Sequence, residues 1–234
     1  MLNAIYLDHA ATSPLHPSAL EAMMPYFTEH FGNPSSIHQF GRRTRHALDE
    51  ARAKLARTIG AHPDEIIFTS GGTEADNMAI IGYMMRNQHK GKHLITTAIE
   101  HHAVLHTCKA LEAKGFEVTY LPVDNTGKIS LDDLKMSIRP DTILATIMFG
   151  NNEVGTIQSI QNIGQLLHEH DIVLHTDAVQ AYGMELINVK TMPIDLLSVS
   201  SHKVNGPKGI GFLYAKKGIN LEAQLHGGEQ ERKR

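Results

Sequence analysis

The sequence predicts an α/β fold, in which a mainly parallel sheet of seven strands carries helices on both faces. Apolar runs of strand length alternate with helical patterns along most of the 234 residues. The run 142–149 is almost wholly apolar, as expected of a strand buried on both faces. Polar residues follow the strands at their carboxyl ends, which is where such sheets bind ligands.

Composition excludes several classes of protein. The apolar fraction of 41% is normal for a globular protein, and a net charge of −3 produces no field that would attract nucleic acid. No apolar run is long enough to cross a membrane, and no signal peptide is visible at the amino end. Cys108 is the one cysteine, so an intrachain disulfide is impossible. We therefore expect a cytoplasmic protein without membrane or direct nucleic-acid contacts.

The first part of the chain predicts a short strand and two helices. Residues 5–7 have the pattern of a strand, and a helix is expected over 17–31 with a proline at its first position. Pro25 inside that pattern predicts a kink or an early end. A second helix is expected over 42–59, followed by Gly60 as its cap.

The rest of the chain supplies the sheet. Strands are expected at 65–69, 93–97, 116–123, 142–149, 172–176, 195–199 and 209–214. Helices are expected between them at 75–85, 103–114, 131–138 and 157–170.

Lys203 follows one of these strands in a loop rich in glycine and proline. A desolvated lysine can lose its proton and form an imine with an aldehyde, and pyridoxal phosphate (PLP) is the cofactor most often held in this way. Taken alone, Lys203 can equally be a surface lysine in a turn. PLP would also require an acid facing its ring nitrogen and a site for its phosphate.

The segment 70–74 is a candidate phosphate site. It joins a strand to a helix through two glycines, so free backbone N–H groups and the helix dipole favour an anion there. Thr73 can add a hydroxyl. The alternative is a plain tight turn in which Thr73 or Ser70 caps the helix.

Asp177 supplies the acid, because it ends the strand before that of Lys203. An aspartate beside a pyridine nitrogen keeps the nitrogen protonated. Taken alone, Asp177 can also be a helix cap or a turn residue. Other polar residues at matching strand ends complete a PLP site: Gln180 for the ring oxygen, His101 for stacking or proton transfer, and Gly72, Thr73, Ser200 and His202 for the phosphate.

Three further residues have side chains that can be reactive. His102 and His106 have a spacing that suits a metal on a helix, but no third ligand is evident and we expect no metal site. Cys108 has apolar neighbours and is expected to be a packing residue.

Several stretches of the chain resemble the NifS/IscS-like cysteine desulfurases, class-V aminotransferases with the aspartate-aminotransferase fold. The resembling stretches are 6–12, 32–38, 68–77, 100–101, 151–155, 175–180, 200–203 and 227–232. The resemblance implies that Lys203 forms the imine with PLP and moves protons at Cα, and that His101 stacks on the ring. It implies that Asp177 and Gln180 contact the ring, that Thr73, Ser200 and His202 hold the phosphate, and that Asn152 orients the substrate carboxylate.

The resemblance also implies a reaction and partners. L-cysteine would give L-alanine and an enzyme-bound persulfide, which supplies sulfur to iron–sulfur clusters or to tRNA thiolation. The partners would be a second copy of the full-length chain and a sulfur-acceptor protein, either a scaffold or a tRNA-thiolation enzyme. The alternatives are a related PLP lyase, such as a selenocysteine lyase, or a non-catalytic fragment that binds PLP or pairs with a family member.

The chain departs from the family at its carboxyl end. The sulfur-accepting cysteine and the arginine that binds the substrate carboxylate lie downstream of Arg234 in the family, and Cys108 is not in the matching place. We expect residues 1–15 to be an N-terminal segment that packs with a small domain, and 16–234 to be the large PLP-binding domain, incomplete at its carboxyl end. The small C-terminal domain is expected to be largely missing.

Overall fold

The computed structural model describes residues 4–228 and 231. Its strands are β1 (Ile66–Thr69), β2 (His93–Thr97), β3 (Glu117–Leu121), β4 (Thr142–Thr146), β5 (Val173–Asp177), β6 (Leu196–Ser200) and β7 (Gly211–Ala215). Its helices are α1 (Pro17–Thr28), α2 (Gln39–Thr58), α3 (Gly72–Asn87), α4 (His102–Glu112), α5 (Leu131–Ser137) and α6 (Ile160–His168), with short 3₁₀ turns η1 (Pro63–Glu65) and η2 (Ser201–Lys203).

The strands form one seven-stranded sheet in the order β1-β7-β6-β5-β4-β2-β3, which confirms the predicted fold class. β7 runs against its two neighbours, and the other strands share one direction. β7 is antiparallel to β6 because the loop that joins them is short, and a parallel arrangement needs a longer crossover connection. The carboxyl ends of β1, β2, β4, β5 and β6 therefore meet at one edge of the sheet.

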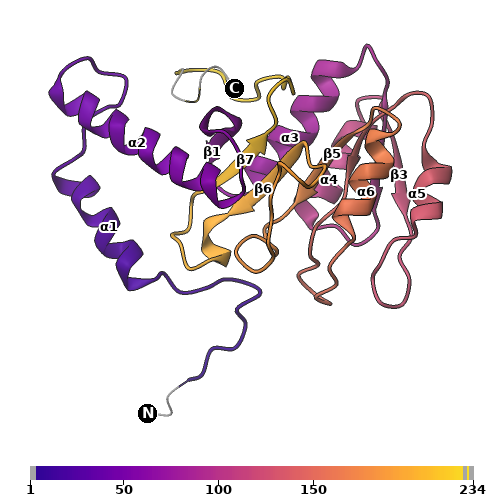
Figure 1. Cartoon of the computed structure of the whole chain (residues 1–234), viewed down its shortest axis with the longest axis horizontal. Coiled ribbons are helices and arrows are strands. Elements are labelled where there is room, and N and C mark those ends of the chain that lie inside the picture. Colours follow the sequence, from indigo (N-terminus) through magenta and orange to yellow (C-terminus); the bar gives the residue numbers. More distant parts are fainter. Residues whose placement is uncertain (1–3, 229–230, 232–234) are drawn as a thin grey trace.

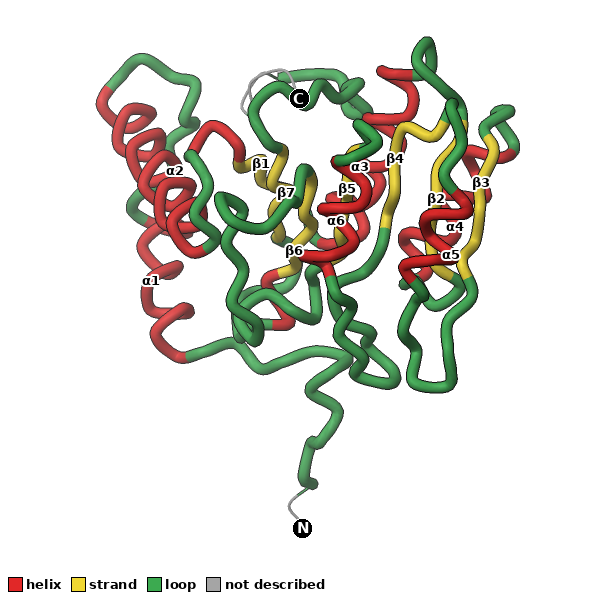
Figure 2. The backbone as a smooth tube through the Cα atoms, turned by 45° about the vertical axis from the view of Figure 1, so that its right-hand side comes forward, coloured by secondary structure: helices red, strands yellow, loops and turns green. Residues whose placement is uncertain are grey.

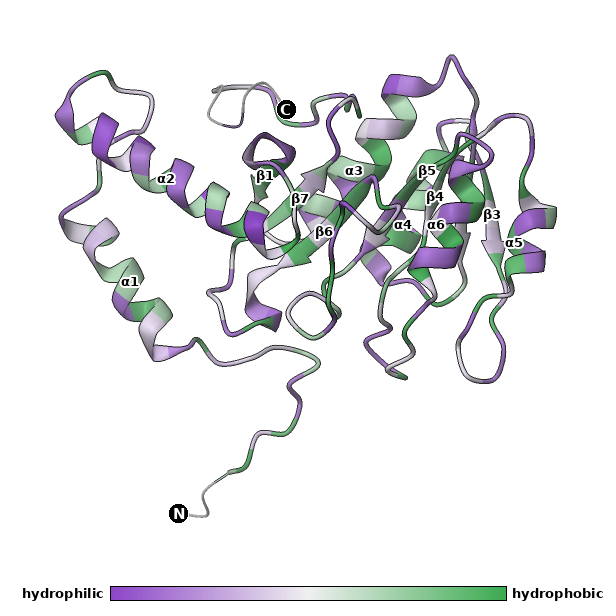
Figure 3. Ribbon diagram, in the orientation of Figure 1, coloured by the Kyte–Doolittle hydropathy of each residue, from purple (hydrophilic) through white to green (hydrophobic). Residues whose placement is uncertain are grey.

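Helices cover both faces of the sheet, as the sequence predicted (Figures 1 and 2). On one face, α3 and α4 pack with alternate residues of the central strands. On the other face, α2, α5 and α6 pack with the remaining strand residues. Figure 3 shows the apolar residues concentrated in this sheet and on the helices against it.

The ends of the first two helices follow from local chemistry. Pro17 occupies the first turn of α1, and the His16 side chain accepts a hydrogen bond from Ser18 N. The helix ends at Thr28, three residues before the expected end, with Pro25 in its last turn. α2 begins earlier than expected because His38 caps it. Gly60 follows with a φ of +73°, which a glycine adopts without strain.

The expected strand at 5–7 is wrong. Ile5 and Leu7 are 82% and 83% exposed, and this segment extends away from the sheet (Figure 1). A strand needs a neighbour for its backbone N–H and C=O groups, and no strand among the described residues lies beside it. The run 142–149 is a strand only to Thr146, after which Ile147 N and Phe149 N still donate to β5 carbonyls.

α1 lies apart from the sheet, and none of its residues is buried (Figure 3). Its apolar side chains, among them Met24 and Phe27, are exposed to solvent together with Phe31 and Phe40 beyond it. An exposed apolar surface of this kind is typical of a contact with another protein surface. No helix in the described part of the chain is long and apolar enough to span a membrane.

Candidate functional site

A cleft of about 500 Å³ lies at the carboxyl ends of the parallel strands. Every residue that the sequence selected as a site candidate lines it: Gly72, Thr73, His101, Asn152, Asp177, Gln180, Ser200, His202 and Lys203. They lie at or just beyond the carboxyl ends of five strands, which meet because these strands point the same way. The volume is in the range of pockets that hold a cofactor.

The amino end of α3 forms one wall of the cleft. No side chain caps this helix, and Gly71 has a φ of +152°, a conformation that favours glycine. A Cβ added at Gly72 would lie 2.8 Å from Cγ2 of Val179, so glycine is needed for the close packing here. The first-turn N–H groups of α3 are therefore available to an anion, with the hydroxyls of Thr73 and Ser200 beside them.

Lys203 sits in η2, directly after β6, and is half-buried. Its Nζ donates a hydrogen bond to the carbonyl of Ala10. Burial lowers the pKa of Lys203 below its ordinary value, and the negative charges of Asp177 and Asp8 oppose that shift. A lysine with a lowered pKa releases its proton more readily, which a nucleophilic amine requires.

The N-terminal segment holds the lysine loop in place. Ser13 Oγ donates to the carbonyl of His202 at 2.8 Å and accepts from Asn205 N at 2.8 Å. His202 Nδ1 lies 3.0 Å from Thr12 Oγ1. Gln180 Nε2 donates to the carbonyl of Ala10 at 2.9 Å. The sequence analysis missed this clamp, because it joins residues about 190 positions apart through backbone atoms that no motif marks.

Asp177 ends β5 at the floor of the cleft. Its Oδ1 accepts a hydrogen bond from Val179 N at 2.9 Å, and its side chain is almost fully buried. Burial raises the pKa of Asp177, while the Val179 N–H and the charges of His101 and Lys203 act in the opposite direction. A buried carboxyl group in this position suits a ligand that carries a positive charge.

His101 and Asn152 stand at the open side of the cleft. His101 caps α4 by accepting from Ala103 N through Nδ1 at 3.1 Å, and its ring is exposed. This leaves a ring face free to stack on a planar ligand. Asn152 donates through Nδ2 to Glu153 Oε1 at 2.8 Å, in the loop after β4.

Glu100 is a second buried acid close to the site. Its Oε1 accepts from Thr97 Oγ1 at 2.7 Å and from Met148 N at 2.9 Å. Burial raises the pKa of Glu100 to about 8, although both hydrogen bonds act to lower it. The carboxyl group is therefore largely protonated at neutral pH, and it ties the loop after β2 to the chain beyond β4.

This shift makes the stability of the folded chain depend on pH. The folded pKa of about 8 lies above the unfolded value near 4.3, so the folded chain retains a proton that the unfolded chain loses. Between pH 5 and 8 the free energy of unfolding falls as pH rises. We expect Glu100→Gln to make the free energy of unfolding fall less steeply, by about 1.4 kcal/mol per pH unit. Urea unfolding at several pH values measures this slope. The exposed Glu169→Gln is the control, and equal slopes in the two variants would contradict the protonated state of Glu100.

The sequence analysis missed Asp76. It lies in the second turn of α3, is 1% exposed and lines the cleft with Asp177. The sequence did contain an indication, because Asp76 lies in a mainly apolar helical pattern. An aspartate is rarely buried without a partner, so such a position suggests a special role. The pattern alone does not show what the acid faces.

Cys108 is fully buried in α4, in agreement with its expected role in packing. Burial raises the pKa of its thiol to about 12, so a thiolate does not form near neutral pH. On the same helix, the rings of His102 and His106 stack with centroids 5.2 Å apart. No cluster of metal-ligating side chains is present in the described part of the chain.

The donor groups of the cleft fit PLP. An uncapped helix end with two hydroxyls suits a phosphate, a half-buried amine suits the aldehyde, and a buried carboxyl suits the ring nitrogen. The Asp76 Oδ1 atom, buried and without a hydrogen-bond partner, shows that the site has unused acceptor capacity.

Comparisons with known proteins agree with this geometry. The sequence profile of the class-V aminotransferases matches residues 5–233. A Bacillus subtilis (strain 168) protein provisionally named cysteine desulfurase IscS 1 is 61% identical over the whole chain and 62% of its own length. Cysteine desulfurase IscS of Methanosarcina thermophila is 58% identical over 99% of this chain and 57% of its own length.

Two solved structures have the same fold. The structure of SspA in complex with cysteine gives a TM-score of 0.95 at 45% identity, over 97% of this chain and 66% of that chain. A NifS-like protein also gives 0.95, at 39% identity, over 97% of this chain and 63% of that chain. The chain thus spans 57–62% of the length of the two curated relatives.

Proposed function

Because the chain belongs to the class-V aminotransferase family, we propose that it is the PLP-binding part of a cysteine desulfurase. One observation carries the proposal: Lys203, Asp177 and the uncapped end of α3 line the same cleft. When bound, PLP supplies an electron sink that stabilises negative charge at the Cα of an amino acid. We place the large domain at 16–234, with 1–15 as a segment that packs with a small domain.

The walls of the cleft would bind and orient the cofactor. Thr73, Ser200 and His202 hold the phosphate together with the N–H groups of α3, where Gly72 permits a close approach. Burial and the nearby Lys203 and Lys208 lower the pKa of His202, so its ring is neutral at pH 7 and its two nitrogens can serve one donor and one acceptor contact.

Two further side chains would contact the cofactor ring. Asp177 accepts the N–H of the ring nitrogen and keeps that nitrogen protonated. Gln180, which already donates to the carbonyl of Ala10, has a second amide hydrogen for the ring oxygen.

Three side chains would act on the substrate. Lys203 holds the cofactor through its amine and, once released, moves a proton at the substrate Cα. His101 stacks on the cofactor ring from the exposed side of the cleft. Asn152 orients the substrate carboxylate from the loop after β4.

The substrate we propose is L-cysteine, supported by the bound cysteine in the SspA structure and the names of the relatives. The C–S bond breaks, the sulfur passes to a thiol as a persulfide, and the carbon skeleton leaves as L-alanine. Cys108 is buried and its thiol has a raised pKa, so it does not accept the sulfur. A cysteine outside these 234 residues fills that role.

The exposed apolar face of α1 supports a protein partner. Met24, Phe27 and their neighbours are open to solvent, and we propose that a second copy of the full-length protein covers them. A sulfur-acceptor protein, for iron–sulfur clusters or tRNA thiolation, is the further partner we propose.

The test is covalent capture of PLP. We expect the chain mixed with PLP to gain the absorbance band of lysine-bound cofactor, and borohydride reduction followed by peptide mass analysis to place PLP on Lys203. Lys203→Ala is expected to lose both signals. Production of alanine from L-cysteine, with a small thiol as acceptor, tests the substrate.

Lys208 provides the matched control, because it lies in the same loop and is exposed. Lys208→Ala is expected to keep the band. A label on Lys208, or a band that survives Lys203→Ala, contradicts the assigned anchor, and no band in any variant contradicts the cofactor itself.

A further inference from the structure

Asp76 and Asp177 are two buried acids that line one cleft. Asp76 comes from α3 and Asp177 from the end of β5, and both line the cleft with 1% and 5% of their surface exposed. Oδ1 of Asp76 is fully buried and has no hydrogen-bond partner among the described residues. Two ionised carboxylates so placed repel each other, and burial reduces the screening of that repulsion by solvent.

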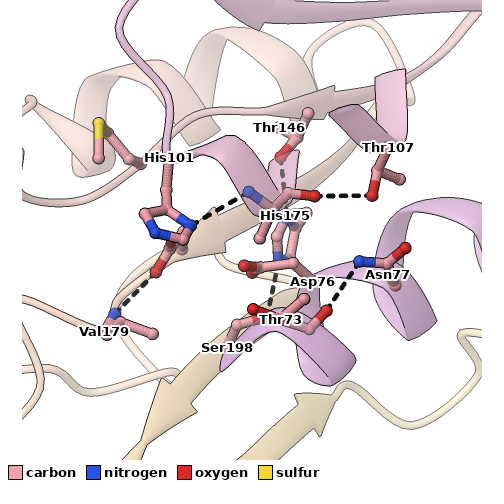
Figure 4. A network of polar contacts seen from close by, with 12 residues as sticks. Thr73, Asp76, Asn77, His101, Thr107, Thr146, His175, Val179 and Ser198 are labelled. Atoms are coloured by element: carbon pink, nitrogen blue, oxygen red, sulfur yellow. Dashed lines mark hydrogen bonds and ion pairs between the residues drawn. The ribbon is translucent and has the colours of Figure 1, made fainter. Parts of the chain in front are cut away.

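The groups that face Asp76 provide no positive charge. On β5, Nε2 of His175 lies 3.6 Å from Asp76 Oδ1. The same His175 is held by Thr146 Oγ1 at 2.8 Å and by Ser198 Oγ at 3.0 Å, as Figure 4 shows. Burial lowers the pKa of His175 to about 3, so the ring is neutral.

The remaining neighbours are two other acids and a hydroxyl. Burial is the largest cause that raises the pKa of Asp76, Asp177 and Glu100 raise it further, and the nearby Ser198 hydroxyl lowers it. The ionised form of Asp177 is better stabilised, because it accepts a hydrogen bond from Val179 N and is close to the charges of His101 and Lys203. If one proton remains in the pair, Asp76 is the acid that keeps it.

We propose that Asp76 is a positioning residue that holds this proton as a neutral acid, so that the single negative charge of the pair resides on Asp177. The neutral acid also offers an O–H donor, which an ionised carboxylate lacks. Asp177 then carries the charge in the cleft that both acids line. The importance of that charge rests on the proposed function, in which it meets the ring nitrogen of PLP.

Infrared spectroscopy of the unloaded 234-residue chain tests where the proton resides. Glu100 is also protonated near neutral pH, so the experiment uses the Glu100→Gln variant, which leaves Asp76 as the expected source of a carboxylic-acid carbonyl band at pH 7. Addition of Asp76→Asn is expected to remove that band. The side-chain amide of asparagine keeps the size and neutrality of the protonated acid.

Two outcomes overturn the proposal. The first is the absence of an acid band at pH 7 in Glu100→Gln. The second is a band that survives Asp76→Asn and disappears with Asp177→Asn, which would place the proton on the other acid.

Unfolding measurements test the coupling between the two acids. In Glu100→Gln, a proton retained by Asp76 makes the unfolding equilibrium constant rise about tenfold per pH unit above pH 5. Asp76→Asn is expected to abolish that rise. Asp177→Asn removes the repelling charge, so the unfolding equilibrium constant is expected to stop rising at a lower pH. If it stops rising at the same pH with and without Asp177, the charge of Asp177 does not affect the protonation of Asp76.

These measurements use no cofactor. Failure of the chain to capture PLP on Lys203 would therefore contradict the proposed function and leave the proton assignment unaffected. Failure of the infrared assignment would contradict the role of Asp76 and leave PLP binding unaffected.

Discussion

Replacement of Arg52 by methionine is expected to lower the free energy of unfolding by about 3 kcal/mol, the largest loss of stability that we expect from one side chain. Arg52 is buried in α2, and its guanidinium makes two hydrogen bonds of 2.8 Å to the Glu231 carboxylate. It also donates to the carbonyl of Ile66 at 2.6 Å and lies 4.6 Å from the centre of the Phe68 ring. Methionine keeps the packing on Phe68 and leaves the Glu231 charge and the Ile66 carbonyl unpaired.

Urea unfolding at neutral pH measures this loss. The control is Arg45→Met on the same helix, because Arg45 pairs with Asp49 across exposed surface. Exposed pairs of this spacing contribute about 0.3–0.5 kcal/mol. Similar small losses in both variants would show that the contact between Arg52 and Glu231 does not stabilise the fold.

Asp177→Asn is expected to weaken PLP binding roughly 10- to 150-fold. A hydrogen bond to a charged group contributes about 1.5–3 kcal/mol, and asparagine supplies the acceptor without the charge. Titration of the chain with PLP, followed at the band of lysine-bound cofactor, measures the affinity.

The same variant is not expected to lose stability in the absence of cofactor. The pKa of Asp177 is raised by burial, so its ionised form is unfavourable in the empty cleft, and asparagine still accepts from Val179 N. An unchanged PLP affinity would contradict a direct contact with the ring nitrogen. So would a loss of unfolding free energy, measured without cofactor, that equals the loss of PLP-binding free energy.

Most of the fold follows from local patterns in the sequence. Buried strands such as 142–146 are runs of apolar residues, and the glycines at 60 and 71–72 mark places where the backbone turns sharply. These signals depend on one residue and its neighbours, so they can be identified without knowing what packs against them. The segment 5–7 shows the limit, because a strand also needs a partner and none lies beside it.

The sequence predicted which residues line the candidate site. It did not predict the contacts that hold them or the second buried acid. Lys203, Asp177 and Thr73 are marked by their places after strands, and the rule that parallel strands end at one edge predicts that they meet. The Ser13 clamp and Asp76 were not predicted. Ser13 acts on the backbone of His202 and Asn205, and Asp76 matters only because α3 turns it toward Asp177.

By itself, the sequence determined the α/β class, the order of strands and helices and the set of polar residues at the strand ends. The tertiary structure decided which charged groups lie close together and how deeply they are buried. That difference is physical, because a strand or a turn is set by short-range backbone and side-chain preferences. The protonation of Asp76, Glu100 and Lys203 is set by burial and by charges that distant parts of the chain bring close.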